Sequence, residues 1–198
     1  RLNAAAFYMD YTDLQIVRFG PTADNPDFGQ FSTENVGEAE IAGVEAEITW
    51  APSENFRLFA TYAYLDTAVD DFTINGVDPT AIPGNSDDLR QAPENKYSLG
   101  GVIDFPLAGG SMISLRADYY HTDEQINDYI NQKTVIDAFD LLDARVSWTS
   151  ASGNWQVALW GKNLTDEEWV SHSYTIGPGV IGVWGAPALY GVSVSYEL

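Results

Sequence analysis

The chain has 198 residues, no cysteine and a formal net charge of −20. These values exclude a disulfide framework and a thiolate metal site, and they argue against a nucleic-acid partner, which would need a basic surface. Six tryptophans and eleven tyrosines are too many for a disordered acidic chain.

The sequence contains no run of about 18 apolar residues, so no transmembrane helix is expected. Transmembrane β-strands are not excluded, since they need only alternating segments of about ten residues. Such alternation predicts about eight strands, and no segment has a helical period. In chain order the strands cover residues 2–19, 32–50, 56–67, 95–105, 112–122, 139–148, 155–162 and 186–198.

The clearest pair of strands lies at residues 42–50 and 56–64. Apolar residues occupy every second position of both runs, and Glu45, Glu47 and Arg57 fall between them. The short break between the runs is rich in turn formers, so the runs form a hairpin with one apolar and one polar face. Such a hairpin suits a soluble sandwich, whose apolar face packs on a second sheet, or a membrane barrel, whose apolar face meets lipid.

The connections between the predicted strands alternate between long and short. Short turns follow residues 50, 105 and 148, whereas the long connections include residues 20–26, 68–92, 123–137 and 164–185. Because consecutive antiparallel strands reverse direction, all the long connections fall at one end of the sheet. Bacterial outer-membrane barrels have this arrangement, with short periplasmic turns and long extracellular loops.

Aromatic residues gather at both ends of the apolar faces. Near the short turns we expect membrane-interface anchors: Trp50, Phe56, Phe105, Trp148, Trp155 and Tyr196. At the opposite ends lie Tyr11, Tyr62, Tyr64, Tyr97, Tyr119 and Tyr190. Two aromatic bands around an aliphatic band are typical of the two interfaces of a membrane. The sequence therefore favours an all-β, antiparallel transmembrane β-barrel over a soluble sandwich.

Four short motifs resemble the barrel of TonB-dependent outer-membrane receptors. In the family's order, they are residues 35–47, 90–93, 162–166 and 186–198. The last motif departs from the family in one position, because Leu198 stands where the family usually ends in Phe. The resemblance implies that residues 1–198 are the C-terminal portion of a barrel of about 22 strands, without the plug domain. We therefore expect an open, curved sheet whose edges pair with strands outside this chain.

The resemblance also implies a location in the outer membrane of a Gram-negative bacterium. The implied activity is the uptake of a scarce solute, most often an iron–siderophore complex and sometimes cobalamin or a glycan. The implied partners are outer-membrane lipid, the plug domain and remaining barrel strands, a small-molecule ligand, and a TonB-type energy-coupling protein that contacts the absent N-terminal region. No enzymatic activity and no cofactor are implied. The alternative is a small stand-alone outer-membrane barrel with a structural or passive pore role, since eight strands can close a barrel.

We expect substrate-binding residues among the large side chains of the long connections, because exposed loops carry function and gain little from large aromatics. The candidates are Phe72, Tyr129, Trp169, His172, Tyr174 and Trp184. The alternative is that these side chains pack the loops against each other.

Other chemistry is not favoured by the sequence. His121 and His172 are the only histidines and lie far apart in the sequence, which argues against a catalytic triad or a histidine metal site. Residues 177–182 fit G-x-G-x-x-G, but no helix start follows them. Loop carboxylates could hold calcium, but solvated acids are the simpler interpretation, so no metal site is predicted.

Overall fold

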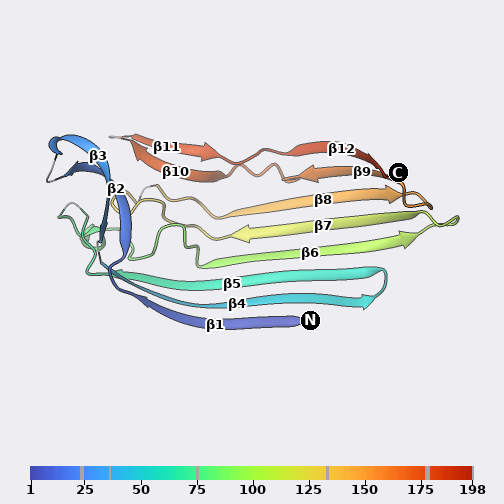
Figure 1. Ribbon diagram of the computed structural model, residues 1–198, viewed down its shortest axis with the longest axis horizontal. Coiled ribbons are helices and arrows are strands. Elements are labelled where there is room, and N and C mark those ends of the chain that lie inside the picture. Colours follow the sequence, from blue (N-terminus) through green and yellow to red (C-terminus); the bar gives the residue numbers. More distant parts are fainter. Residues whose placement is uncertain (23–24, 36, 75, 133, 177–178, 198) are drawn as a thin grey trace.

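Eight antiparallel strands form one sheet in this computed structural model, which describes residues 1–22, 25–35, 37–74, 76–132, 134–176 and 179–197. The strands follow the order β1-β4-β5-β6-β7-β8-β9-β12 (Figure 1). Their bounds are Leu2–Tyr11 (β1), Glu38–Ser53 (β4), Phe56–Asp70 (β5), Asn95–Pro106 (β6), Met112–Thr122 (β7), Phe139–Thr149 (β8), Trp155–Lys162 (β9) and Leu189–Tyr196 (β12). The predicted all-β, antiparallel architecture is confirmed, and β7 and β9 have the bounds that alternation predicted.

Two of the long connections contain hairpins that the alternation pattern did not predict. Strand β2 (Gln15–Thr22) pairs with β3 (Asn25–Asn35) between β1 and β4. Strand β10 (Val170–Ile176) pairs with β11 (Gly179–Trp184) between β9 and β12. Both hairpins lie outside the eight-stranded sheet and form two-stranded sheets of their own.

Three predicted strands were wrong in their extent. The segment 32–50 is not one strand, because residues 32–35 belong to β3 and β4 begins at Glu38. The segment 2–19 is interrupted, because Asp13 has a φ of 59° that extended backbone cannot adopt, so β1 ends at Tyr11. The last strand begins at Leu189 rather than at residue 186. Pro187 precedes it and lacks the N–H that a strand ladder needs. The C-terminal Leu198 lies outside the described residues.

Helical structure in the described part of the chain is limited to one 3-10 turn, η1 (Pro79–Ala81). The Asp78 carboxylate caps it by accepting a hydrogen bond from the Thr80 backbone N–H at 2.9 Å. Among the described residues, no helix is long and apolar enough to cross a membrane.

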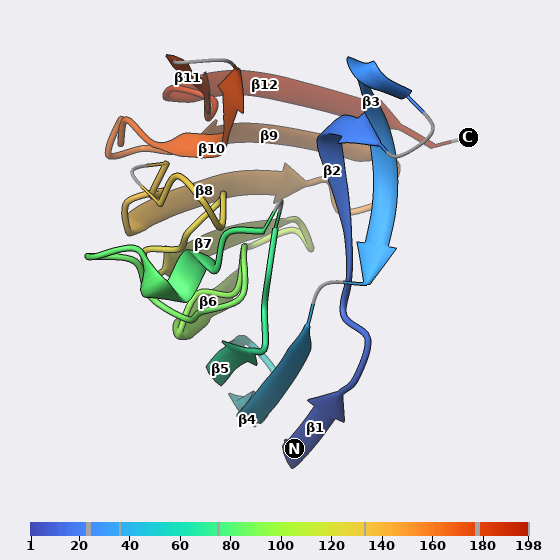
Figure 2. The ribbon, with the colours of Figure 1, turned by 90° about the vertical axis from the view of Figure 1, so that its left-hand side faces the viewer.

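The eight-stranded sheet is curved and open, with β1 and β12 as its edges (Figure 2). All the long connections lie at one end and the short turns at the other, as predicted (Figure 1). The β2–β3 hairpin stands at the long-connection end, where it reaches from the side of β1 and β4 toward the side of β11 and β12 (Figure 1, Figure 2). The expected open sheet is therefore confirmed.

One face of the sheet is apolar, and no described segment packs over it. The strand registers align its side chains in rows: Ile103 on β6, for example, lies opposite Phe56 on β5 and Leu115 on β7. Val192 and Val194 on β12 are 65% and 62% exposed. A continuous apolar face with this exposure fits contact with lipid better than contact with water.

One tyrosine of the second aromatic band was assigned to the wrong face. Tyr11 lies opposite Ala39, so it shares the polar face with Gly43 and not the apolar face. Tyr8 lies opposite Ala42 on the apolar face and is 63% exposed. The assignment failed because β1 has apolar residues on both faces, and its alternation therefore does not identify the lipid side.

The buried apolar core lies among the connections and not between two sheets. Its members are Ile16, Ala39, Val69, Phe72, Ile74, Ile126 and Tyr129. Leu14 and Leu89 pack against it from partly buried positions. The long connections thus form an ordered layer at one end of the sheet, and this layer positions the candidate ligand site.

Candidate ligand site at the loop end

Hydrogen bonds from Gln132 join the connection after β5 to the connection after β7. The Ser86 backbone N–H donates to Gln132 Oε1 at 2.7 Å, and Gln132 Nε2 donates to the Ser86 carbonyl at 2.8 Å. Asn85 Nδ2 adds a bond of 3.1 Å to the Tyr129 carbonyl. Paired polar groups of this kind fix one connection against the other.

The β10–β11 hairpin joins the same layer. Gln91 Nε2 lies 3.1 Å from His172 Nδ1 and also donates to Asn127 Oδ1 at 2.8 Å. Ser173 Oγ donates to the Thr134 carbonyl at 3.0 Å, and both residues are buried. Three connections that lie far apart in the sequence therefore form one packed unit.

Phe72 and Tyr129 are inside this unit. Their exposed fractions are 2% and 7%, and their rings meet edge to face with centroids 4.6 Å apart. The Arg90 guanidinium carbon lies 5.0 Å from the Tyr129 ring centroid, a cation–π distance. These two of the six candidate residues hold connections together, in agreement with the packing alternative.

Trp169 is also engaged with the protein. Its ring stacks on Phe139 with centroids 4.5 Å apart, and it lies so close to Gly185 that a Cβ there would overlap the indole. The Trp169 Nε1 atom is buried and has no hydrogen-bond partner in the described part of the chain. Gly185 is thus required for the close approach of the indole to the backbone.

The remaining candidates lie on the β10–β11 hairpin. His172 and Tyr174 point to the same side of β10, with ring centroids 6.0 Å apart. Tyr174 is 40% exposed, and Trp184 on β11 is 66% exposed. The structure therefore brings His172 and Tyr174 together and leaves the Tyr174 and Trp184 rings open to a ligand.

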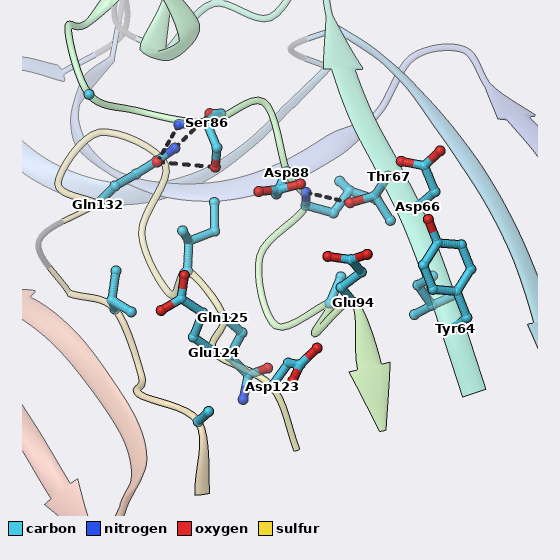
Figure 3. A pocket seen from close by; sticks show the side chains of 17 residues that line it. Tyr64, Asp66, Thr67, Ser86, Asp88, Glu94, Asp123, Glu124, Gln125 and Gln132 are labelled. Atoms are coloured by element: carbon cyan, nitrogen blue, oxygen red, sulfur yellow. Dashed lines mark hydrogen bonds between the residues drawn. The ribbon is translucent and has the colours of Figure 1, made fainter. Parts of the chain in front are cut away.

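An acidic pocket of about 730 Å³ lies between the connections after β5 and β7 (Figure 3). Its carboxylates are Asp66, Asp88, Glu94, Asp123 and Glu124, and no Lys or Arg is among the described residues that line it. The sequence analysis did not identify this pocket. The sequence feature that could have indicated the pocket is the position of acids such as Asp66 and Glu94 near strand ends, beside long connections.

Hydrogen bonds hold Asp123 at one wall of the pocket. Its carboxylate lies 2.9 Å from His121 Nε2 and accepts from Asn95 Nδ2 at 2.7 Å. These bonds, with that of His121 first, lower the pKa of Asp123 below its ordinary value. The second nitrogen of His121 lies 2.7 Å from Asp140, so both of its ring nitrogens are engaged.

The described residues contain no cluster of three or more His, Asp or Glu side chains placed to hold a metal ion. Asp128 accepts hydrogen bonds from the backbone N–H groups of Ile130 and Asn131, which is a turn-stabilising role. Of the glycine-rich run 177–182, residues 177–178 lie outside the described residues, and the rest belongs to β11.

The six expected interface anchors lie on the apolar face, at the short-turn end of the sheet. Trp50 meets Phe56 edge to face at 6.4 Å, and Trp155 lies 4.7 Å from Tyr196. Phe105 and Trp148 are both opposite Ile113 on β7. The anchors therefore form one band across the sheet, and their contact with the membrane interface stays a prediction.

Residues 1–164 match the family described as TonB dependent receptor-like, beta-barrel. The chain belongs to this family. Among solved structures it is similar to the ferric yersiniabactin uptake receptor FyuA from Yersinia pestis, with a TM-score of 0.78 and 15% identity over 100% of this chain and 27% of that chain. It is also similar to the siderophore receptor PiuA from Acinetobacter baumannii, with a TM-score of 0.74 and 18% identity over 98% of this chain and 26% of that chain.

A third similar structure is BauA, the ferric preacinetobactin receptor from Acinetobacter baumannii, with a TM-score of 0.66 and 20% identity over 98% of this chain and 27% of that chain. The chain thus spans about a quarter of the length of these receptors. The resemblance to TonB-dependent receptors is confirmed, and with it the location in the outer membrane of a Gram-negative bacterium. The family consists of transport receptors and not of enzymes.

Proposed function

We propose that the complete protein is a TonB-dependent transporter that imports an iron–siderophore complex. One observation carries the proposal: the sheet and its packed loop layer superpose together on several siderophore receptors. The match covers nearly all of this chain and about a quarter of each receptor. The residues described here supply a wall segment of the barrel and four of its extracellular connections. The alternative of a small stand-alone barrel is not favoured, because the eight-stranded sheet is open.

The wall segment needs several partners in this proposal. Its apolar face contacts outer-membrane lipid, and β1 and β12 pair with the remaining strands of the barrel. A plug domain fills the lumen of such a wide barrel. A TonB-type protein in the periplasm contacts the N-terminal region and supplies the energy for uptake.

The charge of the acidic pocket narrows the class of substrate. Five carboxylates line it, and no described lining residue is basic. An anionic ferric chelate would meet like charges there, whereas a neutral or cationic chelate would not. We therefore propose a neutral or cationic iron–siderophore complex as the substrate.

The open rings of the β10–β11 hairpin are the proposed ligand contacts. Tyr174 and Trp184 offer flat, exposed surfaces, and His172 lies beside Tyr174. Aromatic rings of this kind bind the aromatic and apolar parts of small ligands. Phe72, Tyr129 and Trp169 hold the layer that positions this hairpin.

A transport assay tests the proposal. A strain that lacks the receptor gene is complemented with the complete gene and supplied, under iron limitation, with radiolabelled iron bound to neutral, cationic or anionic siderophores. Uptake of a neutral or cationic chelate that depends on both the receptor and TonB is expected. Uptake of cobalamin or a glycan alone, or uptake without TonB, would contradict it.

Variants of the hairpin test the proposed contacts. W184A is expected to weaken ligand binding by the purified receptor about tenfold or more, as loss of an aromatic anchor does. V183A is the matched control, because Val183 is the exposed neighbour of Trp184 on β11. Equal binding by W184A and the unchanged receptor would remove Trp184 from the site.

A further inference from the structure

The polar face of the sheet carries a row of arginines at one level. Arg116 on β7 lies directly opposite Arg145 on β8, and Arg57 on β5 is separated from Arg116 only by Val102 on β6. Three of the nine Lys and Arg residues of a chain with a net charge of −20 therefore meet on this face. Like charges directly opposite each other destabilise a sheet unless a counter-charge lies between them.

Two of these arginines have a counter-charge on the wall itself. Arg116 holds Asp118 with two bonds, Nε to Oδ2 at 2.6 Å and Nη2 to Oδ1 at 2.9 Å. Arg57 lies 4.0 Å from Asp104. The wall thus neutralises Arg57 and Arg116, which leaves Arg145 at the β8 end of the row.

Arg145 has no ion-pair or hydrogen-bond partner in the described part of the chain. The nearest candidate in its own strand is Asp143, and that carboxylate accepts a hydrogen bond from the Asn163 backbone N–H at 2.9 Å. On the other side Arg145 lies opposite Trp160, whose Nε1 donates to Ser193 Oγ at 3.1 Å. A guanidinium left unpaired beside a second one is a receptor for a carboxylate, which it can bind with two parallel hydrogen bonds.

We propose that Arg145, with Arg116 beside it, forms a docking site for a carboxylate of the plug domain on the inner wall of the barrel. The inference rests on the proposed function, because it requires a plugged barrel. In a barrel of about 22 strands the lumen is filled by a plug, and the polar face of this sheet is the one that faces the lumen. The chain spans about a quarter of the similar receptors, so the segment that covers this face belongs to the rest of the protein.

Hydrogen exchange in the purified, complete receptor tests the docking site without any transport step. R145Q removes the charge, and we expect one segment of the plug to exchange roughly tenfold faster, as for the loss of a charged hydrogen bond. R145E is expected to increase exchange further, because it places two carboxylates together. Retention of the heat-modifiable band on a gel shows that the barrel itself has assembled.

R57Q is the matched control, since it removes the same side chain from the same row at a position whose counter-charge lies on the wall. It is expected to change the hydrogen exchange of the plug less than about twofold.

Unchanged exchange in R145Q, or equal effects of R57Q and R145Q, would overturn the docking site. A change in exchange that appears only when an anionic ferric chelate is added would also overturn it, because Arg145 would then bind the chelate and not the plug. A complete chain without a plug would contradict the proposed function itself, whereas uptake by R145Q with unchanged exchange would contradict only the docking site.

Discussion

Phe59 on β5 lies with its ring directly against Gly100 on β6. A Cβ at Gly100 would overlap the Phe59 ring and would approach Asp118 Oδ1 to 2.6 Å. The Arg116 guanidinium carbon lies 5.1 Å from the same ring centroid. The missing side chain at Gly100 is thus what lets the aromatic ring, the cation and the carboxylate share one place on the polar face of the sheet.

The adjacent glycines on β6 give a matched pair of variants. G100A is expected to destabilise the complete receptor by about 1–3 kcal/mol, the usual cost of overpacking. G101A is expected to change stability by less than about 0.5 kcal/mol, because the nearest atom to its added Cβ would be the Arg57 carbonyl oxygen at 3.7 Å. Thermal unfolding in detergent measures both, and equal midpoints would contradict the close contact.

Loss of the Gln132 side chain is expected to loosen the loop layer. Q132A removes the bonds to the Ser86 backbone N–H and carbonyl, and each buried group left unpaired costs about 1–3 kcal/mol. Limited proteolysis of the complete receptor should then cut the connection around Ser86 faster. Q125A is the control, since Gln125 lines the same pocket and its side chain has no hydrogen bond in the described region.

At acidic pH, the start of the connection after β7 is expected to lose its attachment to His121 through Asp123. The pKa of Asp123 is lowered from its ordinary value of 3.8, chiefly by the hydrogen bond from His121. A lowered carboxyl pKa stabilises the folded state above the ordinary value, and this stabilisation is lost as the pH falls through the folded-state pKa. H121Q raises that pKa toward its ordinary value, so the stabilisation should be smaller and should be fully lost at a higher pH.

Pepsin, which works in acid, can follow this loss. The rate of cleavage between residues 123 and 138 is measured against pH and divided by the rate for an unstructured peptide. The unchanged receptor should resist cleavage to a lower pH than H121Q. Identical profiles for the two proteins would show that His121 does not hold Asp123.

Much of the sheet could be predicted from the sequence, because alternation is a local property. Strands β7 and β9 match their predicted bounds. The hairpin β2–β3 was missed because neither strand alternates cleanly in polarity. The hairpin β10–β11 was missed although β10 alternates, because its partner β11 does not. Tyr11 was misplaced because β1 is apolar on both faces.

The candidate site was less predictable, because it depends on contacts between distant segments. Ser86 and Gln132 are 46 positions apart, and Gln91 and His172 are 81 apart. The sequence could nominate the loop aromatics but could not separate buried rings such as Phe72 from exposed rings such as Trp184. That separation is set by which connections pack together.

Arginine scanning along β5 tests which face meets lipid. L58R places a charge on the apolar face opposite Trp50. The cost there lies between the about 2–4 kcal/mol of the bilayer midplane and the about 0–1 kcal/mol of its interfaces, so less receptor should assemble in the outer membrane. T61R places it on the polar face, where Thr61 Oγ1 lies 2.7 Å from Ser98 Oγ, and assembly should be close to normal. The heat-modifiable fraction of each variant in membranes measures assembly. Equal loss in both variants would count against the assignment of faces.

Two tryptophans of β9 offer the most direct test that the apolar face contacts lipid. Trp155 lies on the apolar face and is 47% exposed, whereas Trp160 lies on the polar face and donates to Ser193. Complete receptors that keep only Trp155 or only Trp160 are reconstituted in bilayers with brominated lipid, and tryptophan fluorescence is measured. Quenching of Trp155 with little quenching of Trp160 is the predicted result, and equal quenching, or stronger quenching of Trp160, would contradict the barrel-wall assignment.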